Sequence, residues 1–379
     1  MIVHEFLRWM DTAPIAMRAG AAHALARAYL HSDVDEETRS GMEAAMTVLL
    51  DDPAHEVRFA LADALASSPA APRHVILTLA TDQMDIAGLV LACSPVFIDA
   101  ELVDIVAGSS DRLQVAVAER PLVSGGVSAA IAEVGEIDAC RTLLLNIGAD
   151  IARISLKRIA ERFGDDPDIR DILLSRTGLP ADIRQMLIRR LSDSLGALVA
   201  GKAWISEGRA TNMTREACDR ATVSIAAESA SEELVPLVEH LRITGQLTTA
   251  LLLRALCAGN VRFLEAALSV LSGIPQARVE SLVEAGRVNA FRGVYAKAGL
   301  PIVAFDAFAA ALETCRKMAE EGGITDRYRF TRRMVENVLA RYRDITDGEA
   351  NELMTMLRRF AADQAREAAR DYARIATAA

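Results

Sequence analysis

The sequence predicts an all-α fold, an α-solenoid of short antiparallel helix pairs that ends in a pair of longer helices. Three observations predict it. Apolar residues recur at the helical period almost everywhere, and the prolines and many glycines fall between these periodic segments. The apolar content comes mostly from Ala, Leu, Ile and Val, whereas aromatic residues make up only 4% of the chain. With 379 residues, the chain can bury a large core without disulfide bonds or metal ions.

The clearest single helix is predicted after residue 53. Asp51-Asp52-Pro53 offers a capping carboxylate and a proline suited to the first helical turn. Breaks in the apolar pattern at Asp52, Asp82 and Asp111 recur at nearly equal intervals, each long enough for one helix pair with its turns. The residues spaced to form one apolar face of this helix are Val57, Ala60, Leu61, Ala64 and Leu65.

A short pattern recurs in the first half of the chain: a β-branched residue, Arg, one spacer and two apolar residues. It occupies residues 57–61, 169–173 and 183–187, and its first occurrence follows Asp52-Pro53. The pattern resembles the HEAT-like repeat class, whose second helix often starts with Asp-Pro, then Val-Arg, then an Ala-rich stretch. The resemblance implies a HEAT-like α-solenoid. The second and third occurrences lack an upstream Asp-Pro at matching spacing.

Four segments are predicted along the chain. Residues 1–195 form N-terminal HEAT-like helical repeats, and 196–215 is a candidate boundary segment because Gly, Ser and Asn interrupt the rhythm. Residues 216–312 form a second helical-repeat block, and 313–379 form C-terminal amphipathic helices.

The second block also carries a distinctive order of short motifs. Leu251–Leu256 is followed by Gly273-Ile274-Pro275 and then by Ala298–Pro301. This order resembles an uncharacterised family of helical-repeat proteins of alphaproteobacteria. The resemblance covers most of the chain up to Pro301 and implies a helical fold in a bacterial cytoplasm, but it implies no catalytic residue.

The last part of the chain is predicted to form two longer helices, over about 325–342 and 348–373. In the second, Leu353, Leu357 and Phe360 fall near one face, and most of the arginines fall elsewhere. Such a helix either caps the end of a solenoid or forms a homodimer, and capping is the simpler interpretation.

Composition excludes several function classes. The net charge of −10 argues against binding of a nucleic acid by the chain as a whole. The five cysteines are widely spaced and include no CxxC pair, which fits buried thiols in a reducing compartment. The longest stretch without charged side chains, Ile86–Ile98, contains Pro95 and is too short to span a bilayer. We therefore expect a cytoplasmic protein with no membrane partner.

Two motifs resemble ligand sites but lack necessary residues. Gly196 to Lys202 reads G-x-x-x-x-G-K, the start of a phosphate-binding loop, yet Ala203 stands where Ser or Thr is needed and a helix is predicted before it. Four aspartates crowd residues 165–171 without the ligand spacing of a calcium loop, and helix capping by Asp166 or Asp168 accounts for them. We expect no cofactor at either motif.

The histidines and cysteines suggest no catalytic or metal site. The six histidines show no HxxxH or HExxH spacing, and His55 and His74 are predicted to lie at the surface or at helix ends. No cysteine has a local context that indicates a lowered pKa. No catalytic residue and no metal ligand is predicted.

The feature best suited to binding is a group of basic residues. In the predicted helix 150–163, Ala152, Leu156, Ile159 and Phe163 form the expected buried face. Stacked repeats would bring basic residues of successive helices together, although a solvated helix face with i,i+4 ion pairs explains them equally simply. The candidate patch consists of Arg153, Lys157, Arg158, Arg162, Arg184, Arg189 and Arg190.

The predicted function is a non-catalytic scaffold or adaptor that binds a protein partner through helical repeats. The alternative is binding of a nucleic acid or another anionic ligand through the basic patch, although the acidic net charge makes nucleic acid a poor candidate. A third possibility is an enzyme whose dispersed acidic residues meet only in the fold. A homodimer through the C-terminal helices is also open.

Overall fold

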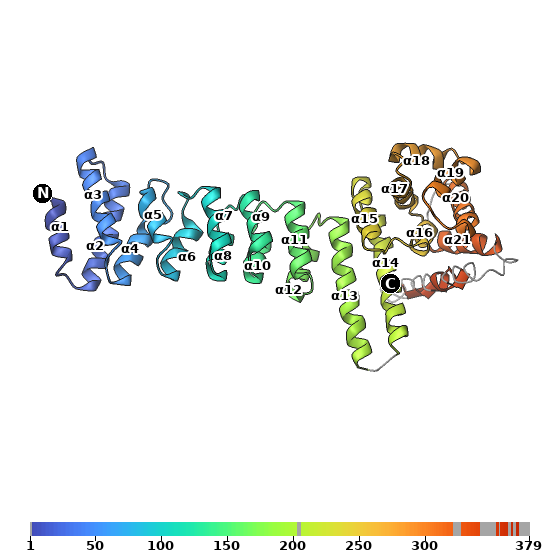
Figure 1. The fold of residues 1–379 in the computed structure, drawn as a ribbon, viewed down its shortest axis with the longest axis horizontal. Helices are drawn as coiled ribbons and strands as arrows, with labels where there is room; N and C mark the ends of the chain where they lie inside the picture. The colour runs from blue at the N-terminus through green and yellow to red at the C-terminus, as the bar shows by residue number, and fades with distance from the viewer. Residues whose placement is uncertain are drawn as a thin grey trace, which may run out of the picture. The chain divides into compact units, whose positions relative to one another are not determined.

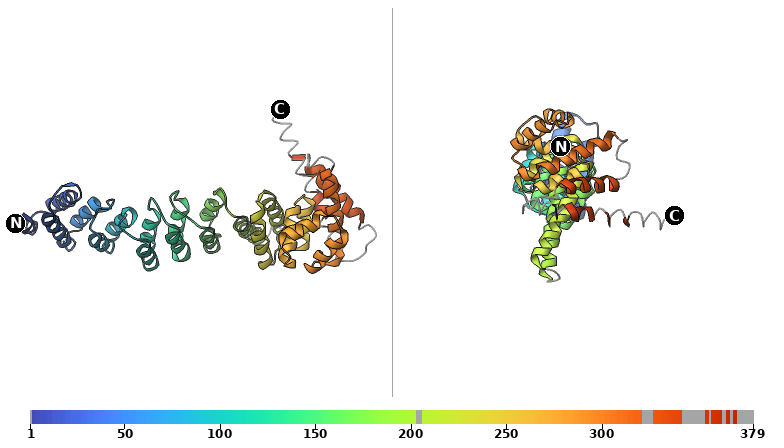
Figure 2. Two further views of the ribbon diagram at one scale, coloured as in Figure 1. Left: turned by 90° about the horizontal axis from the view of Figure 1, so that it is seen from above. Right: turned by 90° about the vertical axis from the view of Figure 1, so that its right-hand side faces the viewer.

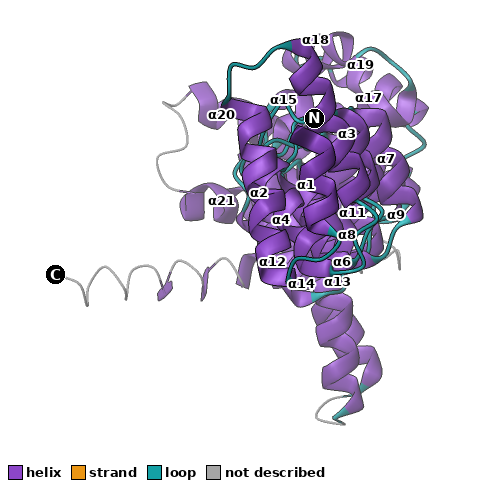
Figure 3. Cartoon of the chain, turned by 90° about the vertical axis from the view of Figure 1, so that its left-hand side faces the viewer, coloured by secondary structure: helices purple, strands orange, loops and turns teal. Residues whose placement is uncertain are grey.

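The computed structural model describes residues 2–202, 206–320 and 327–341, with residues 354–355, 357–362, 365–366 and 369–370. Within these residues the regular elements are helices, and the one strand-like feature is an isolated bridge between Val123 and Ala149 (Figure 3). The all-helical prediction is confirmed. The chain divides into two compact units, unit 1 over Met1–Thr177 and unit 2 over Gly178–Ala379.

Unit 1 consists of short helices joined by loops of a few residues (Figure 1). They are α1 (Ile2–Met10), α2 (Ile15–His31), α3 (Glu36–Leu49), α4 (His55–Leu65), α5 (Arg73–Leu79), α6 (Met84–Cys93), α7 (Asp99–Gly108), α8 (Asp111–Ala118), α9 (Gly125–Val134), α10 (Ile137–Leu145), α11 (Arg153–Phe163) and α12 (Pro167–Ser175).

These helices pack in two rows (Figures 1 and 2). Each even-numbered helix from α2 to α12 packs on the next even-numbered helix, and α7, α9 and α11 form a second row. From α4 to α12 the even-numbered helices begin at His55, Met84, Asp111, Ile137 and Pro167, so one helix pair follows another at a nearly constant interval. This agrees with the regular spacing of breaks in the apolar pattern of the sequence.

Helix α4 shows how the apolar period becomes a core. Val57, Leu61 and Leu65 are fully buried, while Ala60 and Ala64 are half-buried at the margin of the same face. The predicted helix start was wrong. Because α4 begins at His55 after Ala54, Pro53 lies outside the first turn.

Asp52 has a structural role other than capping the first turn of α4. Its carboxylate accepts a hydrogen bond from the Ala54 amide at 2.8 Å and forms an ion pair with Arg18 of α2 at 2.9 Å. The carboxylate therefore links two helices of the even-numbered row.

Polar side chains connect successive helix pairs of unit 1. Arg120 donates to the Leu91 and Ser94 carbonyls, Arg162 donates to the Ala132 and Gly135 carbonyls at 2.8 Å, and Arg176 donates to the Leu144 carbonyl at 2.7 Å. Asn146 donates to the Ala118 and Arg120 carbonyls at 2.8 and 2.7 Å. Each of these acceptors lies about one helix pair upstream, at or near the end of a helix in the preceding pair. We call these four the repeat-linking side chains: Arg120, Asn146, Arg162 and Arg176.

The recurring β-branched-residue–Arg pattern also has a structural explanation. Arg58, Arg170 and Arg184 each donate to a backbone carbonyl a short distance upstream, just before their own helix. Arg58 in addition binds Asp82 through two hydrogen bonds, at 2.6 and 2.9 Å. The shared arginine therefore fixes the chain where it enters the helix.

Unit 2 combines long and short helices around a continuous apolar core. They are α13 (Ala181–Gly201), α14 (Glu207–Glu228), α15 (Ser231–Ile243), α16 (Thr249–Cys257), α17 (Val261–Ser272), α18 (Gln276–Glu284), α19 (Val288–Lys297), the 3-10 helix η1 (Ile302–Ala304), α20 (Phe305–Glu320) and α21 (Arg327–Arg341).

The expected boundary segment, 196–215, lies within a helical hairpin. Residues 196–201 end α13 and residues 207–215 begin α14, and the two helices pack along their length. Their far ends extend beyond the other helices of unit 2 (Figure 2). The division into compact units falls instead between Thr177 and Gly178.

The structure describes only part of the two predicted C-terminal helices. Helix α21 corresponds to the expected helix over 325–342, and of the second helix only short stretches lie within the described residues. There Met354, Leu357 and Phe360 are buried in the core of unit 2. These three side chains are covered by the same unit.

The repeat-linking role of Arg120 predicts a large stability effect. Replacing Arg120 with Met removes two hydrogen bonds from a charged donor and leaves two buried carbonyls without them, which we expect to destabilise α6 and α8 by about 2–4 kcal/mol. Native-state amide hydrogen exchange of α6 and α8 measures this. The control is Arg112→Met in α8, where the side chain is exposed and the change stays within about 0.5 kcal/mol. Equal effects of the two substitutions would contradict the assigned role.

Candidate interaction surface

Two of the four predicted patch residues of unit 1, Lys157 and Arg158, lie beside carboxylates of their own unit. Arg158 forms ion pairs with Glu133 at 2.7 Å and with Glu161 at 3.8 Å, and Lys157 lies 4.0 Å from Glu161. Arg153 is exposed at the start of α11 and interacts with another residue. Such exposed pairs add little stability, but they reduce the positive charge offered to a ligand.

Arg162 was wrongly expected on the outer side of its helix. The side chain is half-buried, donates to two carbonyls of α9 and its C-terminal loop, and stacks on the Phe163 ring at 4.6 Å. The burial pattern of α11 differs accordingly. Leu156 and Ile159 are buried as predicted, whereas Ala152 is exposed and Phe163 is only half-buried.

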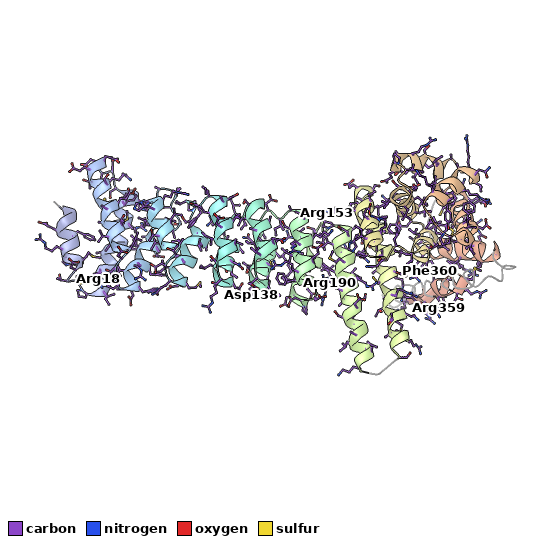
Figure 4. The ribbon with its side chains drawn as sticks, in the orientation of Figure 1. Arg18, Asp138, Arg153, Arg190, Arg359 and Phe360 are labelled. Carbon is purple, nitrogen blue, oxygen red and sulfur yellow. The ribbon has the colours of Figure 1, made fainter. Side chains whose placement is uncertain are left out.

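The three patch residues of unit 2 are similarly engaged. Arg184 donates to the Leu179 carbonyl at 3.2 Å and lies 3.6 Å from Glu228. Arg189 binds Asp193 at 2.9 Å, and this hydrogen bond raises the pKa of Arg189. Arg190, labelled with Arg153 in Figure 4, is half-buried and engaged by another residue. The seven residues are divided between the two units.

Charge is distributed unequally between the units. Unit 1 contains 27 Asp and Glu residues against 15 Lys and Arg residues, a formal charge of −12, whereas unit 2 contains 25 against 27, a charge of +2. Several of the unit 1 arginines are directed to carbonyls inside the unit, so they do not present an open cationic face. The surface charge of unit 1 is therefore dominated by carboxylates.

A buried charged cluster lies in unit 2. Arg254 of α16, with only 5% of its side chain exposed, lies 3.8 Å from Asp219 and donates to the Glu216 carbonyl of α14 at 3.3 Å. Phe360 covers its guanidinium, and Arg359 binds the Glu216 carboxylate at 3.1 Å (Figure 4). Burial raises the pKa of Asp219, and Arg254 opposes that shift. The cluster fastens the C-terminal segment to α14 and α16, which is a structural role.

Glu265 of α17 is a buried carboxyl with like charges beside it. It is 6% exposed, and the charged groups that act on it are Glu280 and Glu284 of α18, with Arg262 on its own helix. Burial, followed by the two neighbouring carboxylates, raises the pKa of Glu265 to about 7. Sequence periodicity missed this residue because a single Glu among apolar residues gives no sign of its orientation.

The motifs that were rejected from the sequence have structural roles. Residues 196–201 are the helical end of α13, and Asp166 caps α12 by accepting from the Ile169 amide at 2.9 Å. His55 pairs with Asp85 at 2.5 Å, and His74 lies 3.4 Å from Glu43. Both histidines link neighbouring helix pairs at the surface of unit 1, as expected for helix-end residues.

The cysteines are free thiols. Cys140, Cys218 and Cys257 are buried and Cys315 is half-buried, but Cys93 is exposed, so the prediction of buried thiols was wrong for that residue. Burial raises the pKa of Cys140 to about 11 and that of Cys315 to about 12. Among the described residues, no cluster of three or more His, Cys, Asp or Glu side chains has a geometry that could hold a metal ion.

A shallow hollow of about 410 Å³ lies between α8 and α10. It is lined by Asp111, Arg112, Asp138 and Arg141, with one valine and one threonine, and Arg141 pairs with Asp138 at 2.5 Å. Small-molecule sites are mostly apolar and enclose their ligand. This hollow is open and lined by charged side chains, so it does not resemble a small-molecule site.

Exposed aliphatic side chains gather around two adjoining loops of unit 1. The loop before α9 and the loop before α11 are joined by the Val123–Ala149 bridge, in which the Val123 amide donates to Gly148 and the Asp150 amide donates to Val123. Leu122 is 78% exposed and Ile147 fully exposed, and Leu145 at the end of α10 and Ile154 at the start of α11 are 62% and 74% exposed. We call these four residues the aliphatic patch: Leu122, Leu145, Ile147 and Ile154.

Sequence reasoning missed the aliphatic patch. Leu122 and Ile147 lie in loops, where the helical period carries no information about which side chains face solvent. The only available signal was the presence of large aliphatic residues in loops, where polar residues are usual.

The raised pKa of Glu265 predicts that the stability of unit 2 depends on pH. The folded state binds the Glu265 proton more tightly than the unfolded state, so stability is greatest at low pH and falls as pH rises from 4.5, the ordinary pKa of Glu, towards about 7. We expect Glu265→Gln to stabilise the chain by about 2–3 kcal/mol at pH 8 and by much less at pH 5.

Urea denaturation of both proteins at the two pH values measures this difference. Glu232→Gln, at an exposed site in the first turn of α15, is the control and should show no such dependence. A Glu265→Gln effect that is the same at both pH values would show that Glu265 is ionised throughout or does not titrate in this range.

Comparison with known proteins shows a match to a protein family. No curated protein and no solved structure matches the chain. Residues 86–347 match the DUF2336 family, described as "Uncharacterised protein conserved in bacteria", and this range begins at α6 and includes most of unit 2. Since the match covers more than half of its residues, the chain belongs to this bacterial family.

Proposed function

We propose that this protein is a non-catalytic scaffold that binds a protein partner, and that unit 1 is a HEAT-like α-solenoid. The observation that carries the proposal is the set of repeat-linking side chains, which join successive helix pairs of unit 1 through hydrogen bonds to buried carbonyls. Stacked helix pairs of this kind typically present extended surfaces to other proteins. A cytoplasmic location and an alphaproteobacterial source stay predictions.

The helices that the structure describes include none that is long and apolar enough to cross a bilayer.

The alternative function, binding of an anionic ligand through the seven-residue basic patch, has weaker support. Lys157, Arg158 and Arg189 lie beside carboxylates, and Arg162 is directed to backbone carbonyls. A protein that binds a polyanion gains affinity from cations that can approach phosphates, and the −12 charge of unit 1 opposes that approach.

Affinity capture tests the proposed function. We expect the tagged full-length chain, added to a native lysate, to retain one protein in a stoichiometric amount after washing. Reconstitution from the two purified proteins, measured by calorimetry, then establishes direct binding. Repeated recovery of the chain alone, under washes that preserve micromolar complexes, would argue against a scaffold.

A binding assay with labelled duplex DNA addresses the alternative. We expect no measurable binding even at low salt, about 0.05 M, because a −10 chain has no strong counterion-release gain. Binding that weakens steeply with salt and is lost in Arg153→Ala with Arg190→Ala would reverse the preference.

A further inference from the structure

The aliphatic patch is held outward by its backbone. The Asn146 side chain accepts from the Gly148 amide at 2.8 Å while its amide nitrogen donates to the Ala118 and Arg120 carbonyls. A Cβ on Gly148 would lie 1.9 Å from the Pro121 carbonyl oxygen, so the two loops approach as closely as glycine allows. Because both loops are fixed in this way, Leu122 and Ile147 have no local route to burial.

An exposed group of this kind is costly unless something covers it. Isolated aliphatic residues are normal on protein surfaces, but here two large exposed ones, Leu122 and Ile147, lie in loops that a backbone bridge joins, with two more in the flanking helix ends. The patch is also fixed before binding, which lowers the ordering entropy that a partner has to overcome.

The charges around the patch indicate the kind of partner. Glu119 lies in the first loop and Asp150 in the second, and both are exposed. The neighbouring arginines are bound elsewhere, so they neutralise the Glu119 and Asp150 carboxylates only in part. Arg120 is buried and donates to carbonyls of the preceding helix pair, Arg176 donates to the Leu144 carbonyl, and Arg153 is engaged by another residue.

The net charge of unit 1 disfavours the other common occupants on electrostatic grounds. Nucleic acids and anionic bilayer surfaces carry the same sign as a unit of charge −12, and so does a second copy of unit 1. A basic protein segment has the opposite sign, and apolar residues on it would be complementary to the aliphatic patch.

We propose that the aliphatic patch of unit 1 is the docking site for a basic, amphipathic protein segment that covers Leu122 and Ile147 and lies against Glu119 and Asp150. The inference rests on the proposed scaffold function and names the partner class. Leu145 and Ile154 extend the apolar contact on either side of Ile147 along the chain.

The test uses the full chain and three labelled helical peptides of about 18 residues, five turns each. The first has Leu on one face and Lys on the other, the second replaces Lys with Glu, and the third replaces Leu with Ala. Fluorescence anisotropy is expected to show tight binding of the Leu/Lys peptide only. Raising NaCl from about 0.05 to 0.5 M should weaken that binding without abolishing it, because the apolar contact is not screened.

Two double variants locate the site. Leu122→Ser with Ile147→Ser should weaken binding of the Leu/Lys peptide at least tenfold, about 1.4 kcal/mol. Ile243→Ser with Ile302→Ser removes side chains of comparable exposure, 74% and 83%, in unit 2 and should have no effect. Circular dichroism of both variants checks that the helices are retained.

The results separate this inference from the scaffold function. Three outcomes would overturn the docking site. Both double variants could weaken binding equally, or Leu122→Ser with Ile147→Ser could bind the Leu/Lys peptide as tightly as the wild type. The Leu/Glu peptide could also bind as tightly as the Leu/Lys peptide. If a partner captured by the full chain binds that variant as tightly as the wild type, the scaffold function stands and the docking site falls. If neither the Leu/Lys peptide nor any captured protein binds, both fall.

Discussion

The fold of unit 1 depends on one constraint: the carbonyls at the C-terminal end of each helix need hydrogen-bond donors, and the next helix pair supplies them. The last four carbonyls of an α-helix have no partner within the helix. In unit 1, Arg120, Arg162, Arg176 and Asn146 satisfy such carbonyls in the preceding helix pair. Apolar packing sets the distance between neighbouring pairs, and these directional bonds, together with ion pairs such as Arg58–Asp82, fix one pair against the next in a single register.

The same bonds determine which surface is left for binding. Asn146 fixes the loop before α11 onto the end of α8, and Gly148 permits its contact with Pro121. A freely moving loop would turn Leu122 and Ile147 towards the nearest apolar surface. Because the loop is fixed, the exposure of Leu122 (78%) and the full exposure of Ile147 are properties of the folded unit.

The sequence was sufficient to predict helices but not contacts between them. The apolar period identified α4 and its buried face, and the even spacing of polar breaks anticipated the regular recurrence of helix pairs. It could not show that Arg162 turns to the carbonyls of the preceding pair, because an arginine at the edge of a helix face has the same sequence pattern whether it points to solvent or to a neighbour. The same limit applied to Glu265 and to the loop residues Leu122 and Ile147.

Directing arginines inward has an electrostatic consequence for unit 1. Each guanidinium bound to backbone carbonyls is held away from a surface carboxylate, and unit 1 keeps an excess of negative charge along its helix pairs. Stacked helices typically lie about 8–10 Å apart, comparable with the screening length in physiological salt, and neighbouring pairs therefore repel weakly along the row. A ligand that binds only the folded state stabilises it by linkage, and a basic ligand also relieves this repulsion. Stability of unit 1 and occupancy of its acidic, apolar surface are therefore coupled, and the same inward-pointing arginines that hold the repeats together give that surface its charge.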